Sequence, residues 1–290
     1  MILVEIIKAV VPESFELYDL SDLHVGSPLC ALDAIEGVIA EVARKKNARL
    51  IVKGDAIECI TPGDKRYTHS CIMDEYKSPK AQADKVVELF SPIKNKILAW
   101  GMGNHEYKAI NTIDLARYMA DQLGVPYGAY NFKLIYYNDI GELMFKSYHT
   151  HGMGSSQSAA KDDIQRDANM KASLKLKLAK SGHADCIYMS RGHDHQLMVV
   201  EPTIHNRLFL TDDGEKIHQH YRQLTNQSAI YIPPDARWYS TTGSFRKMYS
   251  PSGSYVTDYA EMVGYSPSEI GYVKVVVRNR NIIDVKKVVM

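Results

Sequence analysis

The sequence lacks the features that mark several common classes of protein. Its four cysteines are scattered without a CxxC pair, so they indicate neither a structural zinc site nor a framework of disulfides. No tract rich in Pro, Gly or Ser divides the chain, and no internal repeat is visible, which argues against flexible linkers and repeat architectures. The P-loop pattern GxxxxGK(S/T) and the GxSxG turn are absent as well. Nucleoside-triphosphatase and serine-hydrolase activities therefore lack their central residues.

Long apolar runs and a strong charge of either sign are also missing. No apolar run approaches the roughly 20 residues that a membrane span requires, so we expect no membrane segment and no membrane partner. Glu5 and Lys8 interrupt the apolar N-terminal residues and no basic stretch precedes them, so we interpret this segment as a strand. The scattered cysteines lead us to expect a reducing, cytoplasmic setting. The formal net charge is +1, so any basic surface must be a local patch and the overall charge gives no argument for nucleic-acid binding.

The composition that remains is typical of a globular protein. The 290 residues are 45% apolar and 24% charged, and we expect a single domain over 1–290 with insertions. We interpret the stretch 59–79 as a lid-like insertion and the polar stretch 203–227 as a surface loop. The histidines of the second stretch, His205, His218 and His220, are expected to be loop residues rather than a further metal cluster.

Strands and helices alternate in the first half of the chain. The periodicity predicts strands at 15–20, 49–53 and 96–100 and helices at 32–42, 81–94 and 111–123. The second half is more antiparallel, with a predicted hairpin at 131–137 and 143–149, a long helix at 157–180, and strands at 185–190, 229–232, 238–241 and 272–277. A two-sheet α/β sandwich of mixed strands with flanking helices accommodates both halves better than a single doubly wound sheet.

Side chains that can bind a metal follow successive predicted strands. They fall in five short segments: Asp22-Leu23-His24, Gly54-Asp55, Gly103-Asn104-His105-Glu106, His151-Gly152 and Gly192-His193-Asp194-His195. Because α/β folds collect their sites beyond the carboxyl ends of strands, we expect these side chains to meet. In the first and last segments, a spacing of one residue places alternate side chains on the same side of extended backbone. Asp194, between two of these residues, is expected to face solvent.

These five segments resemble the blocks of the calcineurin-like metallophosphoesterases, which run DxH, GDxx(D/E), GNH(D/E), H and GHxH in that order. The resemblance favours the small phosphodiesterase and nuclease members over the protein Ser/Thr phosphatases, because the arginines that clamp phosphate in the latter are missing after Glu58 and before Gly103. It implies the two-sheet sandwich and a centre of two divalent cations. The ligands that it implies are Asp22, His24 and His195 for one ion, Asn104, His151 and His193 for the other, and Asp55 as the bridge between them.

The formal charge of such a centre suits a phosphate ester. Two divalent cations bring four positive charges, and Asp22, Asp55 and a bridging hydroxide remove three, which leaves about one to receive a phosphate anion. A mixture of imidazole, carboxylate and amide ligands suits manganese, iron, zinc or nickel better than calcium, which prefers oxygen alone. We expect manganese.

His105 is the expected catalytic side chain that is not itself a metal ligand. The resemblance implies that it stabilises the transition state or protonates the leaving oxygen, and that Glu58, three residues after Asp55, orients it. One alternative concerns the ligand from the hairpin, because His149 lies two residues before His151 and would share its strand face. We prefer His151, since the family's histidine precedes a glycine.

The resemblance implies hydrolysis of a phosphate ester by a metal-activated hydroxide. We expect a phosphodiesterase acting on DNA, RNA or nucleotides, because the GNH block and the basic helix at 161–180 suit a diester. A solvated helix face is the ordinary explanation of the cations on this helix, although they could also follow a nucleic-acid backbone into the site. A phosphomonoesterase acting on a nucleotide, a small metabolite or a phosphoprotein is the alternative. A non-catalytic scaffold is a third interpretation, although none of the expected ligands is missing. Relatives often pair, so a homodimer is also expected, but nothing in the sequence specifies an interface.

Overall fold

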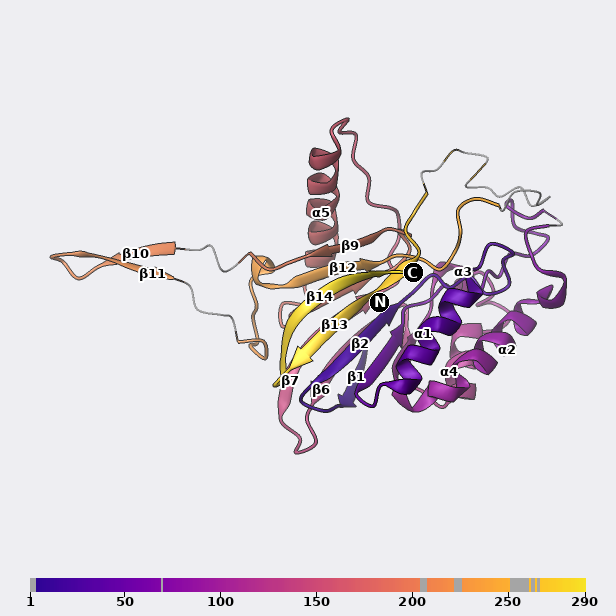
Figure 1. Ribbon diagram of the computed structural model, residues 1–290, viewed down its shortest axis with the longest axis horizontal. Helices are drawn as coiled ribbons and strands as arrows, with labels where there is room; N and C mark the ends of the chain where they lie inside the picture. Colours follow the sequence, from indigo (N-terminus) through magenta and orange to yellow (C-terminus); the bar gives the residue numbers. More distant parts are fainter. Residues whose placement is uncertain are drawn as a thin grey trace.

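Two six-stranded sheets form the body of the protein among the residues that the structure describes (Figure 1). The structure is a computed structural model that describes residues 4–68, 70–203, 208–221, 226–250, 261, 264 and 267–290. The sheets face one another, and helices cover their outer faces. The expected α/β sandwich of mixed strands is therefore confirmed.

The first sheet has the order β14-β13-β2-β3-β4-β5. Its strands are β2 (Phe15–Leu20), β3 (Ala48–Val52), β4 (Ile97–Gly101), β5 (Tyr127–Ala129), β13 (Gly271–Arg278) and β14 (Asn281–Val289). Strands β2 to β5 run parallel, while β13 is antiparallel to both β2 and β14. The carboxyl ends of β2, β3 and β4 therefore lie at one edge, and the first three predicted metal-binding segments follow them directly.

The second sheet has the order β1-β6-β7-β8-β12-β9. Its strands are β1 (Glu5–Val10), β6 (Asn131–Tyr137), β7 (Leu143–Thr150), β8 (Tyr188–Arg191), β9 (Leu197–Val200) and β12 (Trp238–Thr242). Strands β7, β8 and β12 are parallel to one another, so their carboxyl ends also share an edge. The segments containing His151 and His193 leave the sheet there.

Alternation along the strands builds two apolar layers around the first sheet. In β2, Phe15 and Leu17 face the second sheet, whereas Tyr18 and Leu20 face the helices. The helices on that outer face are α1 (Leu32–Arg44), α2 (Pro79–Phe90) and α4 (Leu115–Leu123). The second sheet is covered by α5 (Asp163–Ala179), which packs Leu174 and Leu178 against it. Short helices also occur: α3 (Asn104–Tyr107) and the 3-10 turns η1 (Asp74–Tyr76), η2 (Ser91–Lys96) and η4 (Pro234–Ala236).

Caps explain most differences between predicted and observed helix bounds. The helix predicted at 111–123 begins only at Leu115, because the Asp114 side chain accepts a hydrogen bond from the main-chain N–H of Arg117. The one predicted at 157–180 starts at Asp163 for the same reason, with Asp162 as the cap. The helix predicted at 81–94 ends at Phe90, and the following residues form the 3-10 turn η2.

The strand predicted at 229–232 is wrong. These residues form turn and irregular structure, and the next residues, Pro233 and Pro234, have no N–H group to donate to a ladder. The N–H of Ile232 donates instead to the carbonyl oxygen of Ala184, at 2.7 Å. Of this apolar run, Ile232 is therefore buried within a loop, whereas Ile230 and Tyr231 are exposed.

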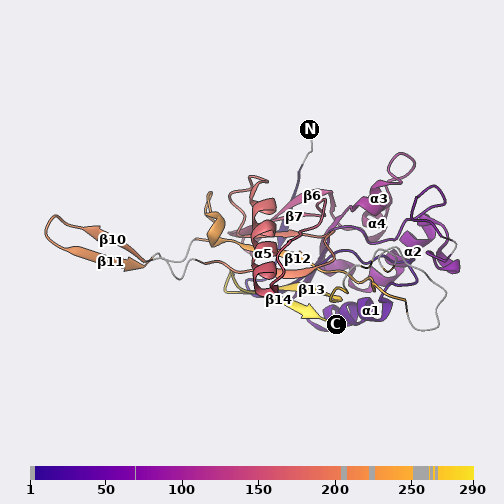
Figure 2. The same cartoon turned by 90° about the horizontal axis from the view of Figure 1, so that it is seen from above.

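The polar stretch 203–227 is not the plain surface loop that the sequence suggested. It carries a hairpin of β10 (Leu208–Asp212) and β11 (Ile217–Tyr221), which projects from the body in both views (Figures 1 and 2). Asp213-Gly214 at its tip is a typical hairpin turn signal, with φ +89° at the glycine. His218 and His220 lie on β11, and His205 lies outside the described residues.

None of the helices in the described ranges is long and apolar enough to cross a membrane.

Candidate metal centre

The loops after β2 and β3 continue the pairing of these strands past their ends. The N–H of Asp22 donates to the carbonyl of Gly54 at 3.0 Å, and the N–H of His24 donates to the carbonyl of Asp55 at 3.0 Å. These bonds hold the side chains of the first two segments side by side. Neither strand-end contact is visible in the sequence, but both follow from parallel strands that end in register.

Five of the seven expected ligands have left-handed backbone conformations. Their φ values are 56° for Asp22, 53° for His24, 49° for Asp55, 70° for His193 and 52° for His195. For residues other than glycine this region costs about 1–2 kcal/mol each, and such strain gathers at functional sites. These strained conformations lower the stability of the fold, and they direct the five side chains toward one centre.

Two glycines allow the segments to approach this closely. Gly54 has φ +101°, and a Cβ atom there would lie 2.1 Å from the main-chain nitrogen of Gly103. A Cβ atom at Gly103 would lie 2.1 Å from Oδ1 of Asp55. Any larger side chain at either position would push the Asp55 and Asn104 segments apart.

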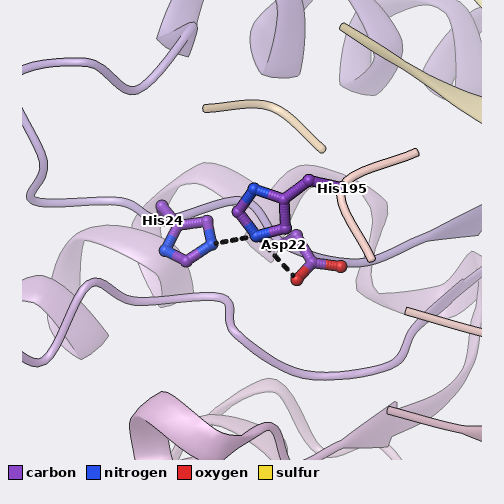
Figure 3. Close-up of side chains that lie close together, drawn as sticks. All are labelled: Asp22, His24 and His195. Atoms are coloured by element: carbon purple, nitrogen blue, oxygen red, sulfur yellow. Dashed lines mark hydrogen bonds and ion pairs between the residues drawn. The ribbon is translucent and has the colours of Figure 1, made fainter. Parts of the chain in front are cut away.

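Asp22, His24 and His195 form the first cluster (Figure 3). One ligand atom from each lies within 4.8 Å of the others. Nε2 of His24 is 3.2 Å from Nε2 of His195, and that atom is 3.3 Å from Oδ1 of Asp22. The structure thus brings together the three residues expected to share one ion.

Asp55, His151 and His193 form the second cluster, with one ligand atom from each again within 4.8 Å of the others. Oδ1 of Asn104 lies 3.0 Å from Nε2 of His151 and 2.7 Å from Nδ1 of His193. Oδ2 of Asp55 lies 3.2 Å from Nε2 of His151. The other four expected ligands are therefore also neighbours.

The donor atoms fit a divalent cation. Oδ1 of Asp22 is buried and has no hydrogen-bond partner among the described residues, and an unsatisfied buried carboxylate oxygen is costly. The facing ring nitrogens of His24 and His195 need a proton or a cation between them, because two lone pairs would repel. A cation bound by these three side chains would satisfy all of these atoms at once.

The pKa values of three ligands favour metal binding. Burial lowers the pKa of His24 to about 4, although Glu58 opposes this shift, so the imidazole is neutral near pH 7. Burial alone would raise the pKa of Asp22 and Asp55, but neighbouring histidines lower both below the usual value. Neutral imidazole and ionised carboxylate are the forms that coordinate a metal.

Glu58 contacts two histidines, the expected His105 and also His24. Its carboxylate Oε2 lies 2.9 Å from Nδ1 of His24, whereas His105 is held through Nδ1 by the main-chain carbonyl of Glu58. The side chain of Glu58 therefore orients a ligand of the first cluster, and its backbone orients His105. The hydrogen bond to His105 thus comes from the main chain of Glu58, while a carboxylate oxygen of Glu58 lies within 4.8 Å of a ring nitrogen of His105.

His149 does not compete with His151. Its ring stacks on Phe132 in the core between the sheets, and its Nε2 lies 2.6 Å from Oγ of Ser147. Strand β7 ends at Thr150, so the chain turns before His151 and only this second histidine reaches the cluster.

Glu106 was not expected to have a role. Its buried carboxylate accepts hydrogen bonds from the N–H groups of Gly103 at 2.9 Å, Asp55 at 3.0 Å and Ala56 at 2.7 Å. It thereby ties the loop after β3 to the loop after β4. The acidic residue that ends the GNH(D/E) block is the signal that could have suggested this.

Asp194 is also buried, not solvent-facing as expected. Its carboxylate accepts hydrogen bonds from N–H and Oγ of Ser156, both at 3.1 Å, and lies 3.5 Å from Nη2 of Arg191. It therefore anchors the loop that follows His151 to the segment that carries His193 and His195.

The insertion 59–79 reaches the site through Arg66, a residue that the sequence analysis did not single out. Nη1 of Arg66 lies 3.4 Å from Nε2 of His105. His69, in the same insertion, lies outside the described residues. The insertion thus contacts the expected catalytic histidine.

No protein-family model and no curated protein matches the sequence. Among solved structures, the chain is similar to a metallophosphoesterase from Sphaerobacter thermophilus, with 13% identity over 94% of this chain and 88% of that chain and a TM-score of 0.40. It is similar to a conserved uncharacterized protein from Streptococcus pneumoniae, described as a predicted phosphoesterase, with 13% identity over 96% of this chain and 98% of that chain and a TM-score of 0.33.

A third similar structure is the NAD nucleotidase of Haemophilus influenzae, with 12% identity, a TM-score of 0.41 and coverage of 96% of this chain. The match spans 50% of that longer chain. At these identities and TM-scores, any functional conclusion depends on the side chains of the site itself.

Proposed function

We propose that the protein is a metal-dependent phosphoesterase with two divalent cations, manganese first among them. The observation that carries the proposal is the pair of adjoining clusters, Asp22-His24-His195 and Asp55-His151-His193, with Asn104 beside the second. The first cluster would hold one cation and the second the other. Asp55 is proposed as the ligand shared by both.

The cations, when bound, would lower the pKa of water and stabilise the charge that develops on the phosphoryl oxygens. Hydrogen bonds within the protein fix the positions of the side chains that would bind these cations. The N–H of His105 donates to Oδ1 of Asp55 at 2.8 Å, which leaves Oδ2 directed toward His151. Glu106 and Glu58 support the loops that carry these side chains.

His105 is proposed to act on the leaving oxygen. Its Nδ1 faces the carbonyl of Glu58, which can only accept, so the proton of the neutral ring lies on Nδ1. Nε2 lies 3.9 Å from Oδ2 of Asp55 and points toward the second cluster. A protonated Nε2 is therefore placed to donate to an oxygen of the ester.

We propose a phosphodiester of nucleic acid or a nucleotide as the substrate, since the ligand and hydroxide charges leave about one positive charge, which matches a diester monoanion. The basic helix gives little support, because several of its cations are already paired within the protein. Arg166 pairs with Asp163 at 3.5 Å, Lys171 pairs with Asp167 at 2.7 Å, and Lys177 donates to the carbonyl of Ser155 at 2.8 Å.

A phosphomonoester is the second candidate, and Arg66 favours it. This guanidinium beside His105 adds one positive charge at the site, which would better match a monoester dianion. The substrate would then be a nucleotide, a small metabolite or a phosphoprotein.

The test is hydrolysis of bis-p-nitrophenyl phosphate and p-nitrophenyl phosphate by the full chain with added manganese, and then of single-stranded DNA, duplex DNA, RNA, cyclic nucleotides and phosphopeptides. Faster hydrolysis of the diester supports the first candidate, and the reverse order supports the second. Absence of turnover on every substrate with manganese, iron, zinc or nickel would contradict the proposed activity.

A further inference from the structure

Arg66 lies beside His105, on an insertion that none of the five metal-binding segments includes. Its side chain is one-third exposed, at 33%, while its neighbour His105 is buried. Nη1 of Arg66 and Nε2 of His105 are 3.4 Å apart. Both of these nitrogen atoms can carry hydrogen, and they lie next to the second cluster, which contains Asp55.

The Arg66 side chain is held in place by Asp64. Nε donates to Oδ1 of Asp64 at 3.2 Å and Nη2 donates to Oδ2 at 3.1 Å, which is the two-point contact that fixes a guanidinium plane. The main-chain N–H of Arg66 also donates to Oδ1 of Asp64, at 2.9 Å. Because these contacts use Nε and Nη2, they aim Nη1 at the site.

The insertion is tied to the body at several points. The N–H of Met73 donates to the carbonyl of Gly26 at 2.9 Å, and the N–H of Cys59 donates to Oε1 of Gln82 at 2.9 Å. Turns within the insertion, including the bond from the N–H of Asp64 to the carbonyl of Thr61 at 2.8 Å, shape the segment before Arg66. The guanidinium is thus presented by an organised loop.

Arg66, its partner Asp64 and the neighbouring Lys108 together carry a net positive charge. Asp64 also forms an ion pair with Lys108, which follows α3, so one carboxylate faces two cations. The local sum is one positive charge, and it lies beside the proposed general acid. An anionic oxygen placed near Nε2 of His105 would be within reach of Nη1 of Arg66.

We propose that Arg66 binds a non-bridging phosphoryl oxygen of the substrate, with Asp64 as the residue that positions it. This inference rests on the proposed function and names a substrate contact for the same site. It also explains how a chain without the two phosphate-clamping arginines of the Ser/Thr phosphatases brings a guanidinium to the phosphoryl group: the insertion supplies it from a different place in the sequence.

The experiment compares Arg66→Gln with Lys65→Gln in the full, manganese-loaded chain. Lys65 is the adjacent residue and is exposed, so its substitution removes the same charge from the same loop. Binding of inorganic phosphate is measured by calorimetry, and KM and kcat are measured on p-nitrophenyl phosphate and bis-p-nitrophenyl phosphate. Circular dichroism checks the fold of each variant.

Arg66→Gln is expected to weaken phosphate binding by about 10- to 100-fold and to raise KM for the monoester more than for the diester. Arg66→Lys should recover part of the affinity, because it keeps the charge but loses the planar contact with Asp64. Lys65→Gln should leave phosphate binding within about twofold, since a screened surface charge contributes little.

Equal phosphate affinity in wild type and Arg66→Gln would overturn the inference, and so would an equal loss in Lys65→Gln. These measurements distinguish failure of this inference from failure of the proposed function. Turnover that persists without any dependence on Arg66 removes this inference and leaves the esterase, whereas Arg66-dependent phosphate binding without turnover on any ester supports the anion site and removes the hydrolytic function.

Discussion

Oδ2 of Asp22 accepts a hydrogen bond from the main-chain N–H of His193 at 3.0 Å. This bond joins the two clusters, because Asp22 belongs to the first and His193 to the second. It also joins the two sheets, since Asp22 follows β2 and His193 follows β8. The proposed metal centre therefore depends on how the sheets are packed together, and not on any one loop.

Replacing His105 with Ala should separate metal binding from chemistry. The variant is expected to retain its manganese content, because neither cluster needs this imidazole, and to lose about 10²- to 10⁴-fold in kcat. Metal content by plasma mass spectrometry and turnover on an aryl phosphate ester are the measurements. His183→Ala, which removes a ring that stacks on Tyr148, is the control and should leave kcat unchanged. Full turnover in the His105 variant would remove its proposed role.

Glu58→Gln should weaken the first cluster. The carboxylate lies 2.9 Å from Nδ1 of His24, and such partners orient a metal-binding histidine and increase its basicity. The manganese affinity is expected to fall by about 10- to 100-fold, measured by calorimetry on metal-free protein. Glu88→Gln on α2 is the matched control, because that side chain is 71% exposed and pairs only with Lys85 among its described contacts. Unchanged affinity in Glu58→Gln would contradict a supporting role for this carboxylate.

Stability at acidic pH should depend on Glu41, far from the proposed site. Its carboxylate accepts hydrogen bonds from the Tyr18 hydroxyl at 2.6 Å and the Tyr272 hydroxyl at 3.1 Å, and from Nζ of Lys274 at 2.9 Å. Burial alone would raise the pKa of Glu41, but the hydrogen bonds of Tyr18, Lys45 and Lys274 lower it from 4.5 to about 2. A carboxyl group with a lowered folded-state pKa stabilises the protein above the unfolded value, and this contribution fades as pH falls from 4.5 toward 2.

Glu41→Gln is therefore expected to lower the urea midpoint at pH 7 and to approach wild type only near pH 2. Glu36→Gln, an exposed position on the same helix, provides the comparison and should match wild type at both pH values. A constant difference between Glu41→Gln and wild type across this range would show that the charge of Glu41 is not the source of the effect.

The sequence predicted the parts of the site that depend on residue type and order. Asp22, Asp55, Asn104 and the histidines follow successive strands, and parallel strands must bring their carboxyl ends to one edge. The structure brings His151, and not His149, to the second cluster, because β7 ends at Thr150. Periodicity cannot show where a strand stops within one residue.

Contacts between distant segments could not be predicted from one sequence. The Glu58 carboxylate meets His24, and Arg66 meets His105, only because separate segments fold onto one another. The left-handed conformations of Asp22 and Asp55 were equally hidden, since local propensity disfavours them. The hairpin β10–β11 was missed although Asp213-Gly214 signals such a turn, because its polar composition resembled a loop.

The most direct test of the metal centre is an anomalous difference map from crystals of the full chain grown with manganese. Two peaks are predicted, one within coordination distance of Asp22, His24 and His195 and one within coordination distance of Asn104, His151 and His193, with Asp55 contacting both. A map without a peak at either cluster, in crystals where manganese is present at saturating concentration, would contradict the account.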